Sequence, residues 1–85
     1  MPKTIFGDAH KSAVAVIIAA RKKQGISQVE LGERIGKTQK FISNIEVGKR
    51  RIDLIEFCAI ARGIDMTPEA LFLLIASELP AKLEI

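Results

Sequence analysis

Two short helices separated by a tight turn are the pattern that most constrains this chain. Residues 27–51 read SQVELGERIGKTQKFISNIEVGKRR. Ser27 suits a helix N-cap, and Glu30 three residues later completes a capping box. Gly36 suits the left-handed residue that ends a helix, and Thr38 can cap the next one. Because apolar residues recur behind both caps at helical spacing, the pattern predicts a helix-turn-helix over about residues 27–46.

Cap signals predict three more helices. Asp8 and Asp53 are expected caps, and Thr67 precedes Pro68, whose missing N–H costs nothing at a first helical position. No segment shows the alternation of a half-buried strand. A chain of 85 residues fits one domain, 1–85, with residues 1–7 as a tail. We therefore expect an all-α fold of five helices, over about residues 9–24, 28–35, 39–46, 54–64 and 68–78.

Positive charge is gathered in the first part of the chain. Residues 1–51 hold eleven Lys and Arg against four Asp and Glu, whereas residues 52–85 hold two against six. One half therefore suits a polyanion and the other half repels it. A cationic face gives affinity for phosphates without sequence information. Because a charge run alone is as often a solvated surface, it is the helix-turn-helix spacing that favours double-stranded DNA as the partner.

The sequence lacks the residues that a catalytic site, a metal site or a membrane-spanning segment needs. The one histidine, His10, has no acid–base partner at motif spacing, and the one cysteine is Cys58. A lone His and a lone Cys do not make a metal site, and no Gly-rich phosphate loop is present. The apolar run over residues 13–20 is too short to span a bilayer and leads into cations rather than a cleavage site. We expect no enzyme activity, cofactor, metal, small-molecule ligand or membrane partner, and a cytoplasmic, nucleoid-associated protein.

A long frame of residues runs G-I-S-Q-x-x-L-G-x-x-I-G-K-T-Q-x-F-I-S-x-I-E-x-G-K-R-R, followed by A-I-A-R and P-E-A-L-F. This frame resembles the lambda-repressor-like helix-turn-helix domains of phage repressors and bacterial xenobiotic-response-element regulators. The likeness covers roughly residues 14–74 without an obvious insertion. The S-Q pair, the I-S-x-I-E-x-G block and the A-L-F run fall at the family's spacing together. The resemblance implies a five-helix domain that binds DNA and regulates transcription.

The resemblance also implies which side chains meet DNA. The second helix of the pair would enter the major groove, where Gln pairs with adenine and Lys donates to guanine. Phe41 either touches a thymine methyl or packs against the preceding helix, and packing is the favoured alternative. The other expected base contacts are Gln39, Lys40, Ser43 and Asn44. The expected phosphate contacts are Gln28, Thr38, Lys49, Arg50 and Arg51, with a solvated loop as the alternative for the two arginines.

Two contacts inside the protein follow from the same resemblance. Gln28 would brace Gln39. Arg21 would form a structural ion pair with Glu46, which aligns the recognition helix on its scaffold rather than adding stability. Gly32 departs from the family, which prefers alanine at this position. Because glycine costs about 0.5–1 kcal/mol inside a helix, we expect a close approach of two helices there.

The last expected helix, over about residues 67–79, carries more apolar residues than one stripe needs. Five consecutive apolar residues, 71–75, cover most of the helical wheel. Part of this helix is therefore expected to meet a second subunit, and two-fold dimers are the commonest such assembly. The alternative is a monomer whose core takes up the whole helix. The expected dimer interface is Leu71, Leu74, Ile75 and Leu79, with Ile5 and Phe6 beside them.

Two functions remain open from the sequence. The favoured one is a sequence-specific transcription regulator, a homodimeric repressor and autoregulator that occupies a pseudo-palindromic operator. With one domain, its control would come from protein concentration and cooperative binding. The alternative is a partner-binding module, such as an antitoxin or a polymerase-contacting regulator, in which protein–protein contact is primary. A pull-down alongside a DNA gel shift separates the two.

Overall fold

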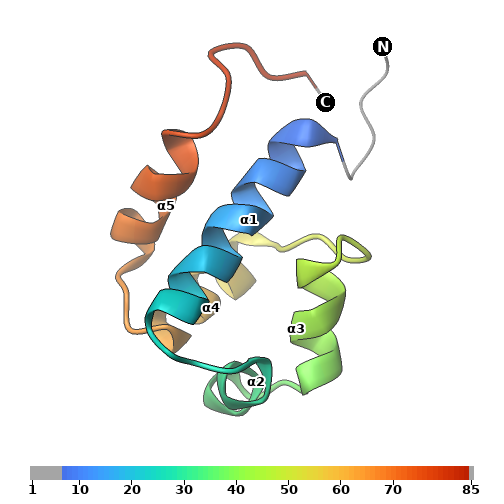
Figure 1. Ribbon diagram of the computed structural model, residues 1–85, viewed down its shortest axis with the longest axis vertical. Helices are drawn as coiled ribbons and strands as arrows, with labels where there is room; N and C mark the ends of the chain where they lie inside the picture. Colours follow the sequence, from blue (N-terminus) through green and yellow to red (C-terminus); the bar gives the residue numbers. More distant parts are fainter. Residues whose placement is uncertain (1–6, 85) are drawn as a thin grey trace.

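The structure describes residues 7–84, which form five helices and the loops that join them. In this computed structural model the helices are α1 (Asp8–Lys23), α2 (Gln28–Ile35), α3 (Gln39–Glu46), α4 (Leu54–Gly63) and α5 (Pro68–Ala76) (Figure 1). No strand occurs within residues 7–84, so the all-α prediction is confirmed. The expected interface residues Ile5 and Phe6 lie outside the described residues.

Side-chain caps begin the last four helices. The hydroxyls of Ser27, Thr38 and Thr67 each accept a hydrogen bond from the backbone N–H three residues later, at 3.0, 3.2 and 3.1 Å. Asp53 begins α4 with a full capping box, in which the Glu56 carboxylate accepts from the Asp53 N–H at 3.1 Å. Each such cap stabilises its helix by about 0.5–2 kcal/mol. The helix starts are therefore determined by residues within one turn.

Two of the expected caps differ from the prediction. The Ser27 capping box lacks its second half, because the Glu30 carboxylate accepts from Arg34 Nη2 at 2.8 Å instead. Arg34 lies one helical turn away and offers a charged donor, which binds a carboxylate more strongly than a neutral N–H does. At the first helix Gly7 holds the cap position and Asp8 is the first helical residue. There its negative charge still suits the positive end of the helix dipole.

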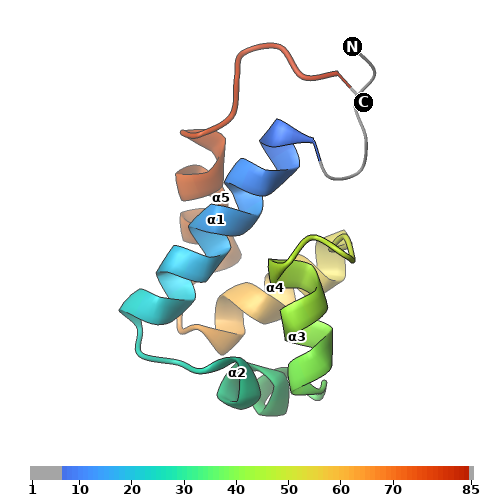
Figure 2. The ribbon, with the colours of Figure 1, turned by 45° about the vertical axis from the view of Figure 1, so that its right-hand side comes forward.

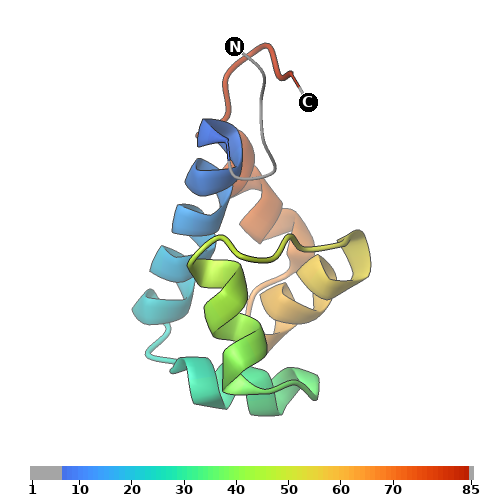
Figure 3. The same cartoon turned by 90° about the vertical axis from the view of Figure 1, so that its right-hand side faces the viewer.

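Helices α1, α4 and α5 form a scaffold that carries the α2–α3 pair. α5 packs against both α1 and α4, and Figure 2 shows it alongside α1. α2 contacts α3 and α4, and α1 contacts α3. In Figure 3 α3 lies in front of the other helices, so that one of its faces meets no other helix. α3 therefore contacts the rest of the fold through its inner face, and its outer face is open to a partner.

Aliphatic side chains from all five helices form the core behind α3. Ile17 of α1 packs there with residues from every other helix. At about 1.5–3 kcal/mol for each fully buried aliphatic side chain, this cluster is the main source of stability. The largest fully buried side chains are Leu31, Ile42, Ile45, Ile60, Ile64 and Leu71.

Two residues expected at a dimer interface belong to this core instead. Leu71 is 0% exposed and Ile75 is 6% exposed, so the interface prediction is wrong for both. The physical reason is that α5 packs on α1 and α4 along the stripe that carries them. Leu79 also packs against the core but stays partly exposed. Leu74, at 47% exposed, keeps substantial free surface.

The turn between α2 and α3 depends on two glycines. Gly36 has φ +73° and ends α2 in the left-handed conformation that glycine adopts without steric cost. A Cβ built on Gly32 would lie 3.0 Å from the backbone oxygen of Lys37 and 3.0 Å from that of Thr38. Backbone atoms cannot move aside as a side-chain end can, so a glycine is required where α2 passes the turn. The close approach expected at Gly32 is present, but its partner is the backbone of the turn at Lys37 and Thr38 rather than a second helix.

Candidate nucleic-acid interface

The outer face of α3 is polar and open to solvent. Ile42 and Ile45, each 2% exposed, anchor the helix in the core. At about 100° per residue, the direction opposite these two belongs to Lys40 and to Val47, two turns further on. Of the expected base contacts, Gln39 and Lys40 are exposed, whereas Ser43 and Asn44 are half-buried. The structure brings all four to the surface of one short helix.

Val47 is a residue of this face that the sequence analysis did not single out. It is 65% exposed and follows the last residue of α3, at the helix C-cap. An exposed apolar side chain beside polar ones is suited to contact with a thymine methyl. Its signal in the sequence was its spacing, seven residues after Lys40 and three after Asn44. That signal was missed because the helix was expected to end at Glu46.

A chain of hydrogen bonds crosses from α1 to the start of α3. Arg21 Nε donates to Glu46 Oε2 at 2.7 Å, and Arg21 Nη2 donates to Glu46 Oε1 at 2.9 Å. Gln28 Nε2 donates to the same Glu46 Oε1 at 2.8 Å. Gln39 Nε2 then donates to Gln28 Oε1 at 3.2 Å. The expected Arg21–Glu46 pair and the expected Gln28–Gln39 contact are both present, and Glu46 joins them.

The Arg21–Glu46 pair is buried. The two side chains are 8% and 7% exposed, and Arg21 Nη1 also donates to the Ile26 carbonyl oxygen at 2.8 Å. The bidentate geometry and the additional bond compensate for the loss of water around both charges. The pair connects α1 to the end of α3, so it sets the tilt of that helix on the scaffold.

The basic loop after α3 folds back onto the helix. The N–H groups of Lys49 and Arg50 both donate to the Asn44 carbonyl oxygen, at 2.8 and 3.2 Å. The loop backbone is thereby held beside the last turn of α3. The side chains of Lys49 and Arg51 are exposed. Thr38 is exposed at the other end of α3, where its hydroxyl caps the helix.

Arg50 has intramolecular partners besides the phosphate role expected for it. Its Nη1 and Nη2 donate to the two carboxylate oxygens of Glu56, each at 2.8 Å, and Nη1 also donates to the Arg51 carbonyl oxygen at 2.7 Å. Its guanidinium lies 4.5 Å from the centre of the Phe41 ring. Arg50 therefore links the loop to α4, while 41% of its side chain stays exposed to solvent. The phosphate role of Arg50 stays a prediction, and the ion pair with Glu56 is a contact that the sequence analysis did not name.

Phe41 packs at the edge of the core between two cations. Its ring is partly buried against the core, with Lys37 Nζ 5.1 Å and the Arg50 guanidinium 4.5 Å from the ring centre. A cation over an aromatic face is worth about 0.5–1 kcal/mol at an exposed site. The packing role favoured for Phe41 is the one that these contacts support. Lys37, an exposed cation in the turn, was not among the candidates.

Charged groups beside the loop shift the pKa values of Glu56 and His10. The Arg50 guanidinium first, and the Asp53 N–H second, lower the pKa of Glu56 to about 2. Burial first, and the charge of Arg51 second, lower the pKa of His10. Both effects favour the uncharged form of His10. The carboxylate of Glu56 remains ionised at every pH at which the protein would meet DNA.

The Glu56 pKa gives a prediction about acid stability. Since the folded pKa lies below the unfolded value of about 4.3, the Arg50–Glu56 contribution is complete above that value and is lost as the pH falls toward 2. Glu56→Gln is expected to melt below the wild type at pH 7, with the difference shrinking between about pH 4.5 and 2. Melting temperatures followed by circular dichroism across this range test it. Glu69→Gln is the control, and a difference for Glu56→Gln that stays constant with pH contradicts the assignment.

Two other kinds of site receive no support from the described residues. Among residues 7–84, no group of three or more His, Cys, Asp and Glu side chains could hold a metal ion. In the same part of the chain, no helix has the length and apolar character needed to cross a membrane.

Comparisons with known proteins agree with this architecture. A family model described as helix-turn-helix matches residues 17–71. An XRE-family like protein from Pseudomonas syringae pv. tomato str. DC3000 is 36% identical, with a TM-score of 0.77 over 85% of this chain and 88% of that one. No curated protein sequence matches the chain.

Two other solved structures are similar in fold. The restriction-modification controller protein C.Esp1396I, solved as a point mutant, has a TM-score of 0.78 at 21% identity, over 85% of this chain and 94% of that one. The clp gene regulator ClgR from C. glutamicum has a TM-score of 0.74 at 14% identity, over 87% and 96%. At these identities the likeness is one of fold alone.

Proposed function

The chain belongs to the lambda-repressor-like helix-turn-helix family, and on that basis we propose that it is a sequence-specific, DNA-binding regulator of transcription. The observation that carries this proposal is the outer face of α3. Four polar side chains and Val47 reach its surface, while the core anchors Ile42 and Ile45 behind it. Because the core holds α3 from one side only, this outer face is available to the major groove of DNA.

Each side chain of this face matches a chemical group that a base edge presents in the major groove. Gln39 offers an amide to adenine, Lys40 offers donors to guanine O6 and N7, and Val47 offers methyl groups to thymine. Asn44 can read adenine one turn further along the helix, and Ser43 can donate to either a base or a phosphate. Good bidentate base contacts discriminate by about 1–3 kcal/mol each. The face therefore supports sequence preference in addition to affinity.

Phosphate contacts are proposed on both sides of α3. Lys49 and Arg51 extend from the loop that returns onto the end of the helix. Thr38 lies at its start, and Gln28 lies at the start of α2, where unpaired N–H groups and the helix dipole favour an anion. Lys37, which is exposed in the turn between the helices, joins this set. Such contacts orient a protein on DNA without reading the sequence.

A binding-site selection on random duplex DNA tests the proposal directly. We expect purified protein to enrich one sequence, with a preference that survives at physiological salt. Charge alone gives weak binding that falls steeply with added salt and prefers no sequence. Protein that binds heparin and random polymer as well as any selected duplex would refute sequence-specific recognition. The matched control keeps Ile42, Ile45 and Glu46 in place and exchanges only the outer-face residues of α3 among themselves, so that the net charge and the buried contacts are retained.

Loss of a loop cation should weaken all DNA equally. Lys49→Ala or Arg51→Ala is expected to lower affinity for selected and random duplexes by the same factor, and to reduce the slope of log K against log salt by about 0.9. Fluorescence anisotropy at four salt concentrations measures both quantities. Lys82→Ala, which removes an exposed cation near the end of the described chain, should change neither. A sequence-dependent loss for Arg51→Ala would instead assign it to a base.

We further propose that the protein acts as a homodimer through the outer surface of α5. Phe72, Leu73 and Leu74 are 55%, 70% and 47% exposed. Phe72 meets Phe57 of α4 edge-on, with ring centres 6.3 Å apart, whereas Leu74 borders α1. The three side chains therefore form one apolar strip from the α4 side to the α1 side. A strip of this kind on a chain of 85 residues is typical of a subunit contact.

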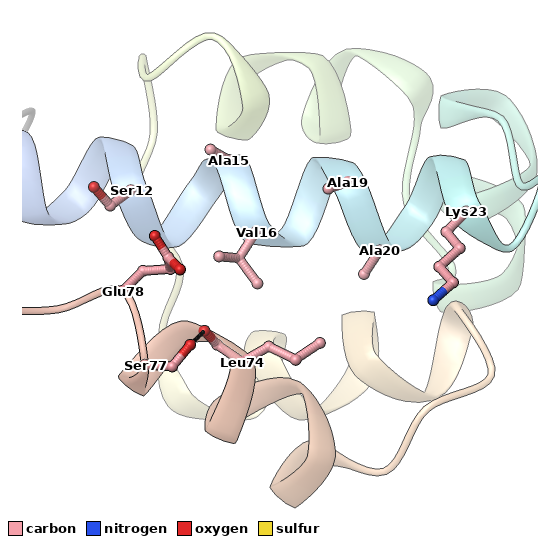
Figure 4. Close-up of a pocket in the computed structure, with 9 residues that line it drawn as sticks. All are labelled: Ser12, Ala15, Val16, Ala19, Ala20, Lys23, Leu74, Ser77 and Glu78. Atoms are coloured by element: carbon pink, nitrogen blue, oxygen red, sulfur yellow. Dashed lines mark hydrogen bonds between the residues drawn. The ribbon is translucent and has the colours of Figure 1, made fainter.

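A groove beside the strip supports this choice of surface. It has a volume of about 430 Å³ and lies between α1 and α5. In Figure 4 Leu74 lies across from Val16 and Ala20, with Lys23 at one end of the groove and Glu78 at the other. Opposite charges at the two ends suit a copy related by a two-fold axis, because each Lys23 could then face a Glu78. A two-fold dimer presents two recognition helices about 34–36 Å apart, one turn of DNA.

Leu73→Asp should separate the subunits while the fold is retained. Leu73 is 70% exposed, so the new charge costs little in a monomer but is buried unpaired in a dimer. We expect a monomer by analytical ultracentrifugation and at least a tenfold loss of operator affinity, with an unchanged circular dichroism spectrum. Leu54→Asp, at an 84% exposed leucine on α4, is the charge-matched control. A Leu73→Asp protein that remains a dimer would exclude this surface.

As a repressor, the protein would occupy an operator that overlaps a promoter, including its own. The partner-binding alternative has one observation in its favour, since Leu54 and Ile55 on α4 are 84% and 78% exposed. These two side chains add apolar surface that a dimer through α5 does not need. If the purified protein is a monomer that selects no duplex, the antitoxin or polymerase-contacting alternative takes precedence.

A further inference from the structure

We infer that Glu46 is a positioning residue for base specificity. Through Gln28, its carboxylate fixes which way the Gln39 amide points, so that Gln39 prefers adenine to guanine. This inference rests on the proposed DNA-binding function and extends the role of Glu46 beyond its ion pair with Arg21. It is carried by two hydrogen bonds in series, Gln28 Nε2 to Glu46 Oε1 at 2.8 Å and Gln39 Nε2 to Gln28 Oε1 at 3.2 Å.

The polarity of this series begins at a buried carboxylate. The Glu46 side chain is 7% exposed and receives two N–H groups of the Arg21 guanidinium. An ionised carboxylate can accept hydrogen bonds but cannot donate one. Gln28 must therefore turn its NH₂ group toward Glu46, because its oxygen would be repelled there. The oxygen and nitrogen ends of an amide have nearly the same shape, and here the carboxylate determines which end faces it.

The same polarity passes to Gln39. Once the NH₂ of Gln28 is bound to Glu46, its oxygen faces Gln39 and can only accept. Gln39 must then donate one N–H to Gln28, which leaves its oxygen and its second N–H for DNA. Bonds aligned in series polarise one another, so each strengthens the preference of the next. A charge buried at the end of α3 thus controls an exposed side chain at its beginning.

This orientation matches adenine. In the major groove adenine presents the N6 amino group as a donor and N7 as an acceptor, whereas guanine presents O6 and N7, both acceptors. The free oxygen of Gln39 fits the N6 donor, and its free N–H fits N7. Against guanine the same oxygen would face O6, and two acceptors repel. The series therefore penalises guanine as well as favouring adenine.

Replacing the carboxylate by an amide removes the polarity with almost no change of shape. In Glu46→Gln the side chain can either donate or accept, so the Gln28 amide can reverse. A reversed Gln28 donates to the Gln39 oxygen, and Gln39 then presents N–H where it had presented an acceptor. That N–H can donate to guanine O6, while the adenine N6 amino group loses the acceptor it had met. We expect the variant to accept both purines at the position that Gln39 reads.

The test measures affinities of paired duplexes. Selection with the wild type gives the site, and Gln39→Ala identifies the position at which the preference is lost. At that position wild-type protein should prefer adenine to guanine by about 5- to 150-fold, the range expected for one bidentate contact. Glu46→Gln should reduce this ratio to less than about threefold. The preference at the position assigned by Asn44→Ala, measured in the same proteins, should not change.

Gln28→Leu is the second variant, because Glu46→Gln also weakens the ion pair with Arg21. It removes the amide from the series and leaves the Arg21–Glu46 pair in place. The adenine-to-guanine ratio should fall there as well, whether or not the first variant folds. A role that is only structural would lower affinity at every position together. A fall confined to the Gln39 position is therefore the signature of positioning.

The outcomes separate this inference from the function on which it rests. A wild type that selects no duplex overturns both. A wild type that selects a site with a base other than adenine at the Gln39 position overturns the inference and leaves the function standing. The same is true if Gln28→Leu keeps the wild-type adenine-to-guanine ratio. Reduced ratios at this position alone support it.

Discussion

Replacing Arg21 by methionine is expected to lower the free energy of unfolding by about 3–5 kcal/mol, the typical cost of removing one member of a buried pair. Methionine keeps the length of the side chain but removes the charge opposite Glu46, whose side chain is 7% exposed. The Ile26 carbonyl oxygen loses its donor as well. The hydrogen bond from Gln28 Nε2 would still reach the carboxylate, but it carries no compensating charge. Urea denaturation of both proteins at one concentration measures the difference.

The double variant Arg21→Met, Glu46→Leu is the control for this prediction. Removing both charges leaves no buried ion, so most of the lost stability should return, as is common when a buried pair is replaced by apolar residues. DNA affinity should stay low in the double variant, because the series through Gln28 to Gln39 has lost its origin. A single Arg21→Met variant with both the stability and the DNA affinity of the wild type would show that the pair does not position α3.

Leu71→Ala is expected to destabilise the fold by about 2–5 kcal/mol. Leu71 is 0% exposed and belongs to the cluster that joins all five helices. Truncation removes its buried methyl groups and leaves a cavity that the surrounding helices close only in part. This result would show that Leu71 acts within one subunit. Denaturation should therefore show the loss equally at low and at high protein concentration.

Leu73→Ala is the comparison for Leu71→Ala. Leu73 lies two residues away on α5 and is 70% exposed, so its truncation should change the stability of a single subunit by no more than about 0.5 kcal/mol. Any larger effect of Leu73→Ala should depend on protein concentration, because it would come from the dimer. If Leu71→Ala shifted only the dimerisation constant, the assignment of Leu71 to the core would be wrong.

Local signals in the sequence predicted the helices well. Ser27, Thr38, Asp53 and Thr67 each begin a helix, because a cap bonds to a backbone N–H three residues along. The outward positions of α3 also followed from spacing, since the buried Ile42 determines the opposite side. Val47 was missed because it lies one residue beyond the end of the helix, although its side chain still belongs to the outer face.

Errors arose where a residue had more than one available neighbour. The apolar run of α5 indicated burial for Leu71 but did not say whether a helix of the same chain or a second subunit would cover it. For Arg50 the sequence analysis did not find the partner Glu56, which lies six residues on, across the turn into α4. Glu30 was expected to close its own capping box, and Arg34 took its carboxylate instead.

By itself, the sequence determined which segments are helical, which helix pair forms the helix-turn-helix and which half of the chain is positive. These features depend on interactions within about one turn of the chain and on composition. The family resemblance had predicted the Arg21–Glu46 pair and the Gln28–Gln39 contact, whereas the tertiary structure alone decided that Glu46 also accepts from Gln28, 18 residues away, and so joins the two. A carboxylate can accept from several donors, and only packing brings the donors within reach. The orientation of the side chain that faces DNA is therefore a property of the fold.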